Sequence, residues 1–360
     1  MVAPPIERVE QNGHADRQTM PQIQIDTTRR TRRRSVMDTP DTERALAIEA
    51  VGLERRFGDF VAVDKVDLAV RQGEIYGFLG PNGAGKSTTC RMLCTLTAPS
   101  GGRATVAGHD IAREAGAVRL RIGAALQSAA LDNMQTGTEL LRQQGRYYGL
   151  KSAEIEQRLA ELRDLIDLGD ALDQRIKGYS GGMKRRIDLA AALIHNPEVL
   201  FLDEPTTGLD PVSRVKVWEE VRRLNTELGM TIFLTTQYLE EADTLADRVG
   251  IIDHGRIVAE DTPEALKRSI GSDLVVVRVD DIETARRAVE SVPVVEAVDV
   301  HGDELTASTS DGPAAVSPIA IALSQAGVGV QTLLLRAPTL DDVFLTLTGN
   351  RLQEQQEEAN

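Results

Sequence analysis

One segment narrows the possible folds more sharply than any other, and its sequence is Gly80-Pro81-Asn82-Gly83-Ala84-Gly85-Lys86-Ser87, followed by Thr88. It matches the pattern G-x-x-x-x-G-K-[ST], which occurs by chance in about one chain in a hundred of this length. Residues 74–79, which are largely apolar after Glu74, predict a strand before it, and residues 86–97 predict a helix after it. The segment therefore predicts a phosphate-binding loop between a strand and a helix.

Each part of this loop has a chemical task. Glycines allow consecutive backbone N–H groups to turn inward around a phosphate, and the helix N-terminus adds its partial positive charge. In this pattern Lys86 reaches the β- and γ-phosphate oxygens, and the Ser87 hydroxyl ligates Mg²⁺. We expect residues 80–88 to bind a nucleoside triphosphate with its metal ion.

From about residue 47 to 271, short apolar runs alternate with longer amphipathic ones. Residues 198–202 and 231–235 predict buried strands, and residues 138–168 predict helices within an insertion at about 128–195. This alternation is typical of an α/β fold with a largely parallel sheet.

An acidic pair, Asp203 and Glu204, ends the predicted strand 198–202. The carboxyl end of a strand is where an α/β sheet holds ligand-binding groups. Asp203 is therefore a candidate Mg²⁺ ligand, direct or through a neighbouring group, and Glu204 a candidate general base for the attacking water.

The two ends of the chain differ from its middle. Residues 1–46 lack a sustained apolar period and predict a disordered lead segment; residues 350–360 form a polar tail. The Arg-rich run 29–34 is either a solvated tail or a weak anchor to anionic lipid, and no apolar stretch of an export signal follows it.

Residues 272–349 predict an accessory domain. The expected order is strand 274–279, helix 282–292, strands 294–300 and 304–309, helix 314–325 and strand 328–335, with a last helix at 339–347. This βαββαβ order predicts a small α+β, ferredoxin-like domain. Its role is either dimerisation and packing or ligand sensing.

Composition argues against several kinds of function and site. A net charge of −14 and 3% aromatic residues disfavour binding to nucleic acid. No run approaches the roughly 18 apolar residues that span a bilayer, so we expect no membrane crossing by this chain. Cys90 and Cys94, without a neighbouring Cys or His, predict packing on one helical face rather than a disulfide or zinc site.

A further motif, Tyr179-Ser180-Gly181-Gly182-Met183, precedes a predicted helix and then Leu200-Phe201-Leu202-Asp203-Glu204. These two segments resemble the signature motif and Walker B of ATP-binding cassette (ABC) proteins, over residues 47–271. The resemblance implies a P-loop cassette with a mixed sheet and a helical insertion. It also implies a head-to-tail pair of cassettes, with each ATP between one Walker A and the partner's Ser180, Gly181 and Gly182.

The resemblance assigns further residues. Phe57 matches the aromatic that stacks on adenine, and Asp210, in Gly208-Leu209-Asp210, matches the D-loop that crosses the dimer. Gln127 matches the Q-loop glutamine that senses Mg²⁺ and water beside the membrane partner. Glu204, Lys86 and Gln127 then form the catalytic set, and Ser87, Gln127 and Asp203 the metal set.

One catalytic position departs from the general family. The switch residue that contacts the γ-phosphate is usually His, and here it is Gln237, which cannot become an imidazolium. The surrounding run, with Ile252-Asp253-His254-Gly255 and Pro338-Thr339-Leu340-Asp341-Asp342-Val343-Phe344, resembles drug-export ATPases of the daunorubicin-resistance type, which have Gln there.

The resemblance implies the nucleotide-binding subunit of an ABC exporter at the cytoplasmic face of a bacterial membrane. Such a subunit uses ATP and Mg²⁺, pairs with a second copy of itself and drives separate membrane-spanning permease subunits. The cargo is a lipophilic drug or a complex lipid. The alternatives are a soluble cassette ATPase and a resistance protein that sequesters drug under ATP control.

Overall fold

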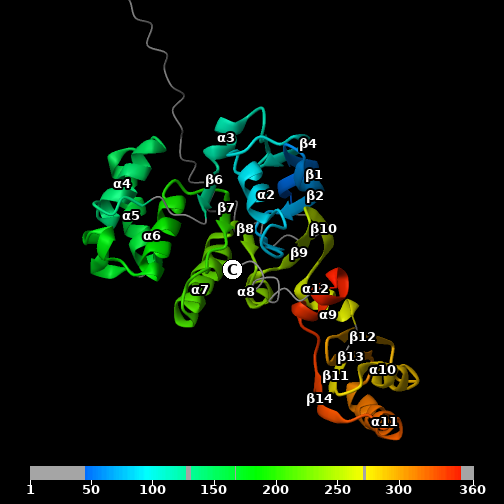
Figure 1. The fold of residues 1–360 in the computed structure, drawn as a ribbon. Helices are drawn as coiled ribbons and strands as arrows, with labels where there is room; N and C mark the ends of the chain where they lie inside the picture. The colour runs from blue at the N-terminus through cyan, green and yellow to red at the C-terminus, as the bar shows by residue number, and fades with distance from the viewer. Residues whose placement is uncertain (1–44, 127–130, 167, 271–272, 350–360) are drawn as a thin grey trace, which may run out of the picture.

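The computed structural model describes residues 45–126, 131–166, 168–270 and 273–349. Its largest sheet has six strands in the order β10-β9-β3-β8-β7-β6, and all neighbours pair in parallel except β9 and β10 (Figure 1). The strands are β3 (Ile75–Leu79), β6 (Ile122–Ala125), β7 (Val199–Asp203), β8 (Thr231–Thr236), β9 (Arg248–Asp253) and β10 (Arg256–Asp261). Every residue of β3, β7 and β8 is buried, which explains the short apolar run in each of them. The three strands predicted in this part of the chain are therefore confirmed.

An antiparallel sheet lies against one side of this core, in the order β2-β1-β4-β5. Its strands are β1 (Leu46–Phe57), β2 (Phe60–Arg71), β4 (Gly101–Val106) and β5 (His109–Asp110), and the short helix α3 (Ala115–Arg119) follows. Helix α2 (Lys86–Leu93) follows the phosphate loop and packs in the apolar core that both sheets share. Cys90 and Cys94 are buried in this core, as the packing interpretation predicts. The antiparallel sheet makes the larger unit mixed α/β.

A helical region projects to one side of the large sheet (Figure 1, green). It contains α4 (Gly137–Tyr147), α5 (Ser152–Ile166), the 3₁₀ turns η2 (Gly169–Asp173) and η3 (Ile176–Gly178), and α6 (Gly181–Leu193). Helix α4 begins with a capping box formed by Thr136 and Glu139, which satisfies two amides of its first turn. The helices α7 (Pro211–Leu228) and α8 (Leu239–Leu245) follow β7 and β8.

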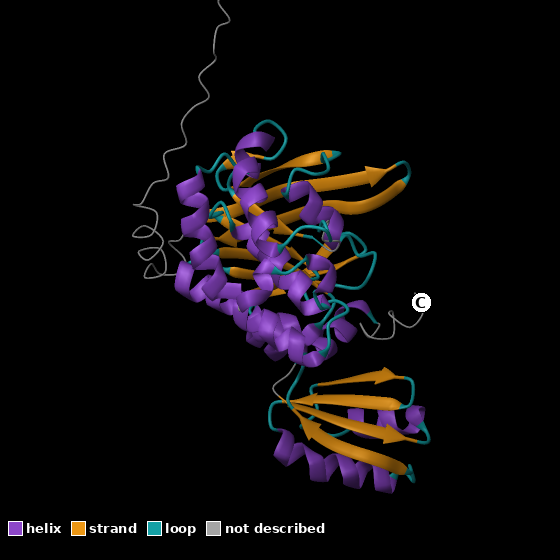
Figure 2. Ribbon diagram, turned by 90° about the vertical axis from the view of Figure 1, so that its left-hand side faces the viewer, coloured by secondary structure: helices purple, strands orange, loops and turns teal. Residues whose placement is uncertain are grey.

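The C-terminal unit is a four-stranded antiparallel sheet with two helices on one face (Figure 2). Its elements are β11 (Asp273–Val279), α10 (Ile282–Glu290), β12 (Ala297–His301), β13 (Glu304–Thr309), α11 (Gly312–Gln325) and β14 (Val330–Arg336). The order β12-β13-β11-β14 is that of a split βαβ, so the predicted ferredoxin-like topology is confirmed.

The last helix, α12 (Leu340–Thr348), packs outside that sheet. Its buried Leu340, Val343 and Phe344 join a core with residues of β3, β9, α8 and α9 (Pro263–Ser269). The sequence pattern places this helix with the C-terminal unit, whereas its apolar face belongs to the core of the larger unit. The physical reason is that the two helices of the ferredoxin-like unit already cover the apolar face of its sheet.

Within the described residues, no helix is both long enough and apolar enough to pass through a bilayer. The Arg-rich run 29–34, with the rest of the lead segment up to residue 44, lies outside the described residues, as do Gln127 and the polar tail from residue 350.

Candidate active site

The phosphate loop depends on glycine at two close approaches. A Cβ at Gly80 would lie 2.2 Å from the Ile252 carbonyl oxygen, and one at Gly85 would lie 2.5 Å from the Ala62 carbonyl oxygen. Gly85 also has φ of +108°, a left-handed conformation that side chains rarely adopt. Because Gly85 is the N-cap of α2 and has no side chain, the first amides of this helix face the loop without a side-chain cap. The loop is thus shaped to bind an anion with its backbone.

Lys86 is held across this loop. Its Nζ donates to the carbonyl oxygens of Gly80 at 2.8 Å and Pro81 at 2.9 Å, and lies 3.3 Å from a carboxylate oxygen of Glu204. The side chain is 3% exposed. Burial lowers the pKa of Lys86, and the Glu204 carboxylate opposes that shift. Its ammonium group therefore lies between the loop and the acidic end of β7.

Asp203 ends β7 at the centre of a small hydroxyl cluster. Its Oδ1 accepts from Ser87 Oγ at 3.0 Å and from Thr235 Oγ1 at 2.5 Å. Its Oδ2 is buried and has no hydrogen-bond partner among the described residues. Mg²⁺ prefers oxygen ligands and is bound in proteins through one or two carboxylates with phosphates and water. The Ser87 hydroxyl and the open carboxylate oxygen of Asp203 fit this ion.

Glu204 occupies a strained backbone position. Its φ of +50° is left-handed, although it is not glycine. Its N–H donates to the Thr235 carbonyl oxygen at 3.0 Å and lies 3.1 Å from the Thr235 hydroxyl, while Thr207 Oγ1 donates to its carboxylate at 3.3 Å. These contacts turn the Glu204 side chain toward Lys86 and the phosphate loop, apart from the Asp203 carboxylate.

A cavity of about 320 Å³, called the nucleotide cavity below, opens beside Lys86, Ser87 and Glu204. It is lined by Phe57, Phe60, Ala62, Asn82, Gly83, Gly85, Lys86, Ser87, Thr88 and Glu204. Phe57 is 49% exposed at its rim, and the Arg55 guanidinium lies 4.4 Å from its ring centroid on one side. An aromatic ring of this exposure offers a flat face to a base.

Phe60, not singled out in the sequence, also lines the cavity and is 63% exposed. It pairs with Phe57 across a two-residue turn. The sequence Phe-Gly-Asp-Phe is typical of a tight hairpin and could have indicated that the two rings lie close together. Thr235 was likewise missed, because a Thr in an apolar strand gives no sign that it faces a carboxylate.

The signature residues and Asp210 do not line this cavity. Ser180 caps α6 by accepting from the Met183 N–H at 3.3 Å, and Asp210 caps α7 by accepting from the Ser213 N–H at 3.0 Å. A Cβ at Gly182 would lie 3.3 Å from the Ser213 hydroxyl, so the two helix N-termini are neighbours. Ser180, Gly181 and Asp210 are exposed. The N-termini of α6 and α7 therefore form an exposed pair outside the cavity.

Gln237 follows β8 and its side chain is partly buried, with an amide oxygen that has no hydrogen-bond partner within the described residues. Gln127 lies outside those residues, so its predicted roles stay predictions.

Comparison with known proteins gives the site its context. Residues 63–207 match the family described as ABC transporter. Daunorubicin resistance ATP-binding protein DrrA2 of Streptomyces coeruleorubidus is 48% identical over 85% of this chain and 96% of its own length. The chain belongs to the ATP-binding subunits of ABC transporters. It is of the daunorubicin-resistance type, and it binds and hydrolyses ATP as the ATPase subunit of an exporter.

Other ABC subunits support the same family. Daunorubicin/doxorubicin resistance ATP-binding protein DrrA of Streptomyces peucetius is 47% identical over 86% of this chain and 94% of its own. Nod factor export ATP-binding protein I of Sinorhizobium fredii is 41% identical over 86% and 88%. A solved ATP-binding subunit of an ABC transporter has a TM-score of 0.56 at 29% identity, over 62% of this chain and 92% of that one. ABC subunits of this kind pair as cassettes and act with membrane permeases.

Proposed function

We propose that this ABC subunit powers efflux of a lipophilic drug or a complex lipid through separate permease subunits, at the cytoplasmic face of a bacterial membrane. The cargo proposal is supported by relatives that are named for daunorubicin resistance and for Nod factor export. The division at about residue 271, with the accessory role of residues 272–349, stays a prediction.

The contacts around the cavity support a proposed role for each residue. Phe57 stacks on the base, the backbone of residues 80–88 and the Lys86 ammonium bind the phosphates, and Glu204 accepts the proton of the attacking water. Ser87 and Asp203 hold Mg²⁺, with Gln127 proposed as a further ligand; the ion supplies charge neutralisation at the phosphates. Gln237 donates a hydrogen bond near the γ-phosphate. The observation that supports these roles is the Lys86–Glu204 contact inside the nucleotide cavity.

The exposed signature residues support a head-to-tail pair of two copies. Helix N-termini bind anions, and the one at Ser180 lies outside the cavity of its own chain. A second copy can bring its nucleotide to that end, and Asp210 beside it then lies at the contact between the two copies.

Hydrolysis and transport test this proposal together. Glu204→Gln is expected to bind ATP with unchanged affinity while its kcat falls by at least about a hundredfold, because the general base is lost. Lys86→Ala is expected to lose ATP binding itself. Turnover in Glu204→Gln at the wild-type rate contradicts the assigned base.

Vesicles that contain the permease separate export from drug sequestration. ATP-dependent movement of drug or lipid across the vesicle membrane supports export, whereas ATP-dependent drug binding without movement contradicts it. A rate of ATP hydrolysis that is the same with and without the permease contradicts the proposal that this subunit is coupled to it.

A further inference from the structure

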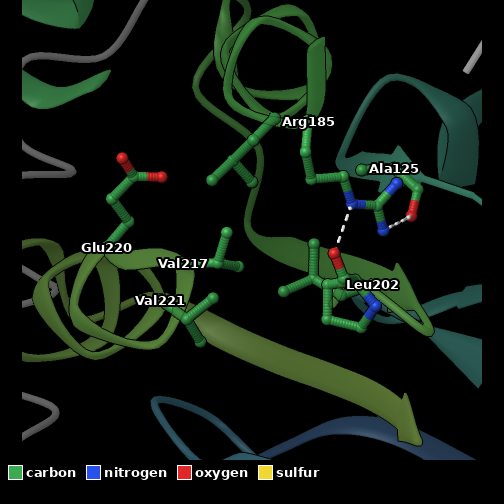
Figure 3. Close-up of a pocket in the computed structure, with 8 residues that line it drawn as sticks. Ala125, Arg185, Leu202, Val217, Glu220 and Val221 are labelled. Carbon is green, nitrogen blue, oxygen red and sulfur yellow. Dashed lines mark hydrogen bonds between the residues drawn. The ribbon is translucent and has the colours of Figure 1, made fainter. Parts of the chain in front are cut away.

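Arg185 lies outside the nucleotide cavity, on the second turn of α6, yet its guanidinium reaches the two strand ends that lead into the site. Its donors contact four backbone carbonyl oxygens: Pro205 from Nε at 3.0 Å, Leu126 from Nη1 at 3.0 Å, and Ala125 and Asp203 from Nη2 at 3.3 and 3.4 Å. Figure 3 shows the side chain extended from α6, with its planar end beside Ala125 and Leu202.

Burial fixes this guanidinium in place. The side chain is 12% exposed, and Asp188, one turn along α6, accepts from Nη1 at 3.3 Å. A buried guanidinium is tolerated when its five N–H donors find acceptors, and a planar fork loses its geometry if it is replaced by a point charge. Arg185 therefore ties α6 rigidly to the ends of β6 and β7.

At the end of β7, Arg185 contacts the residues on both sides of Glu204. The Asp203 carbonyl oxygen belongs to the peptide before Glu204, and the Pro205 carbonyl oxygen belongs to the residue after it. Glu204 has φ of +50°, and such a conformation persists only where its surroundings fix it. One guanidinium holds the backbone on both sides of that residue.

We propose that Arg185 positions the Glu204 carboxylate by fixing the Asp203–Pro205 segment against α6. Because α6 begins at the signature residue Ser180, the same side chain links the signature end of a cassette to its own hydrolytic site. The proposal rests on the role proposed above for Glu204.

Steady-state hydrolysis by the full chain tests this role. Arg185→Lys keeps the charge but loses the fork, and Arg185→Met loses both. We expect kcat to fall about tenfold in Arg185→Lys and further in Arg185→Met, because a small misplacement of a reacting group is costly. KM and the ATP dissociation constant, from equilibrium dialysis, are expected to stay within about twofold, because Lys86 and Phe57 bind the nucleotide without contacting Arg185.

Arg158, a residue of α5, provides a matched control because it contacts the other end of α6. Its guanidinium donates to the carbonyl oxygens of Leu193 at 2.9 Å and Ile194 at 3.2 Å, far along the helix from Ser180. Arg158→Lys makes the same chemical change to a similar carbonyl cluster, and its kcat is expected to stay within about twofold of wild type. A loss of kcat equal to that of Arg185→Lys would overturn the positioning role.

Two further outcomes decide between this proposal and the one it rests on. Wild-type kcat in Arg185→Lys, or a kcat loss matched by an equal rise in KM, overturns the role of Arg185 and leaves the base assignment standing. Wild-type turnover in Glu204→Gln overturns both.

Discussion

At the scale of single residues, the orientation of the Asp203 carboxylate depends on a hydroxyl far from it in sequence. Thr235, on the adjacent strand β8, donates to the same Asp203 Oδ1 that accepts from Ser87, and Oδ2 has no hydrogen-bond partner among the described residues. The parallel register places Asp203 directly opposite Thr235. The carboxylate that we propose as a Mg²⁺ ligand is thus oriented by a residue of the neighbouring strand.

Thr235→Val is therefore expected to weaken Mg²⁺ binding without removing a ligand. Loss of a hydrogen bond to a charged group costs about 1.5–3 kcal/mol, so the Mg²⁺ concentration that half-saturates hydrolysis should rise roughly tenfold or more. Thr236→Val is the control, since that buried hydroxyl accepts from the Tyr238 N–H instead. An equal Mg²⁺ shift in both variants would show a general loosening of β8.

Residues within a contiguous motif could be predicted from sequence, whereas residues brought in by strand pairing could not. The spacing of residues 80–87 predicted Lys86 and Ser87 in one cavity, and the apolar run before Asp203 predicted its place at a strand end. Thr235 and Arg185 depend on which strands are neighbours, and nothing local in their sequences specifies that order.

At the scale of elements, His195 joins the helical region to the large sheet. Its ring stacks on Tyr148, which follows α4, at 3.6 Å between centroids, and its Nε2 lies 2.9 Å from the carbonyl oxygen of Ile122 in β6. Burial lowers the pKa of His195 to about 4. The imidazole is consequently neutral in the folded chain at neutral pH.

This burial predicts a loss of stability in mild acid. An unfolded His takes up a proton near pH 6.5, whereas the folded state stays neutral until about pH 4. The free energy of unfolding therefore falls as the pH falls from about 6.5 toward 4. Between pH 7.5 and 5 the free energy of unfolding should fall by about 2 kcal/mol on account of this residue. Urea unfolding of His195→Gln at both pH values should show a flatter dependence than wild type.

The exposed His254 serves as the control for that experiment, because its side chain is 88% exposed. His254→Gln should keep the wild-type pH dependence. If His195→Gln keeps it as well, the buried imidazole does not set the acid sensitivity of the fold.

The elements themselves differ in how far their sequences predicted them. The buried strands β3, β7 and β8 each contain a short apolar core, and the order of strands and helices in residues 273–336 matches a sheet with helices on one face. The long hairpin of β1 and β2 was not predicted, because its residues alternate irregularly around several register shifts. The predicted helix 86–97 ends early, at Leu93, where Thr95 takes a left-handed φ of +61°.

At the scale of the whole molecule, the chain leaves the larger unit after α9 and returns to it as α12. Leu340, Val343 and Phe344 are 2%, 1% and 0% exposed in a core that also contains Leu79, the residue before Gly80. Arg336 and Asp342 form an ion pair between the end of β14 and α12. The last helix thus supports the strand that leads into the phosphate loop.

Two shortened chains separate the contribution of α12 from that of the ferredoxin-like unit. One ends after residue 271; the other replaces residues 272–338 with about ten Gly and Ser residues, which span roughly 18 Å on average, and keeps α12. Removing three buried apolar side chains costs about 1.5–3 kcal/mol each, so the first chain should melt roughly 10 °C or more below wild type. The second should melt within a few degrees of wild type and keep its affinity for ATP, because α9 and α12 are neighbours. Equal melting temperatures for the two shortened chains would show instead that α12 does not stabilise the larger unit. If both then melt below wild type, the ferredoxin-like unit stabilises the chain; if both melt with wild type, neither part does.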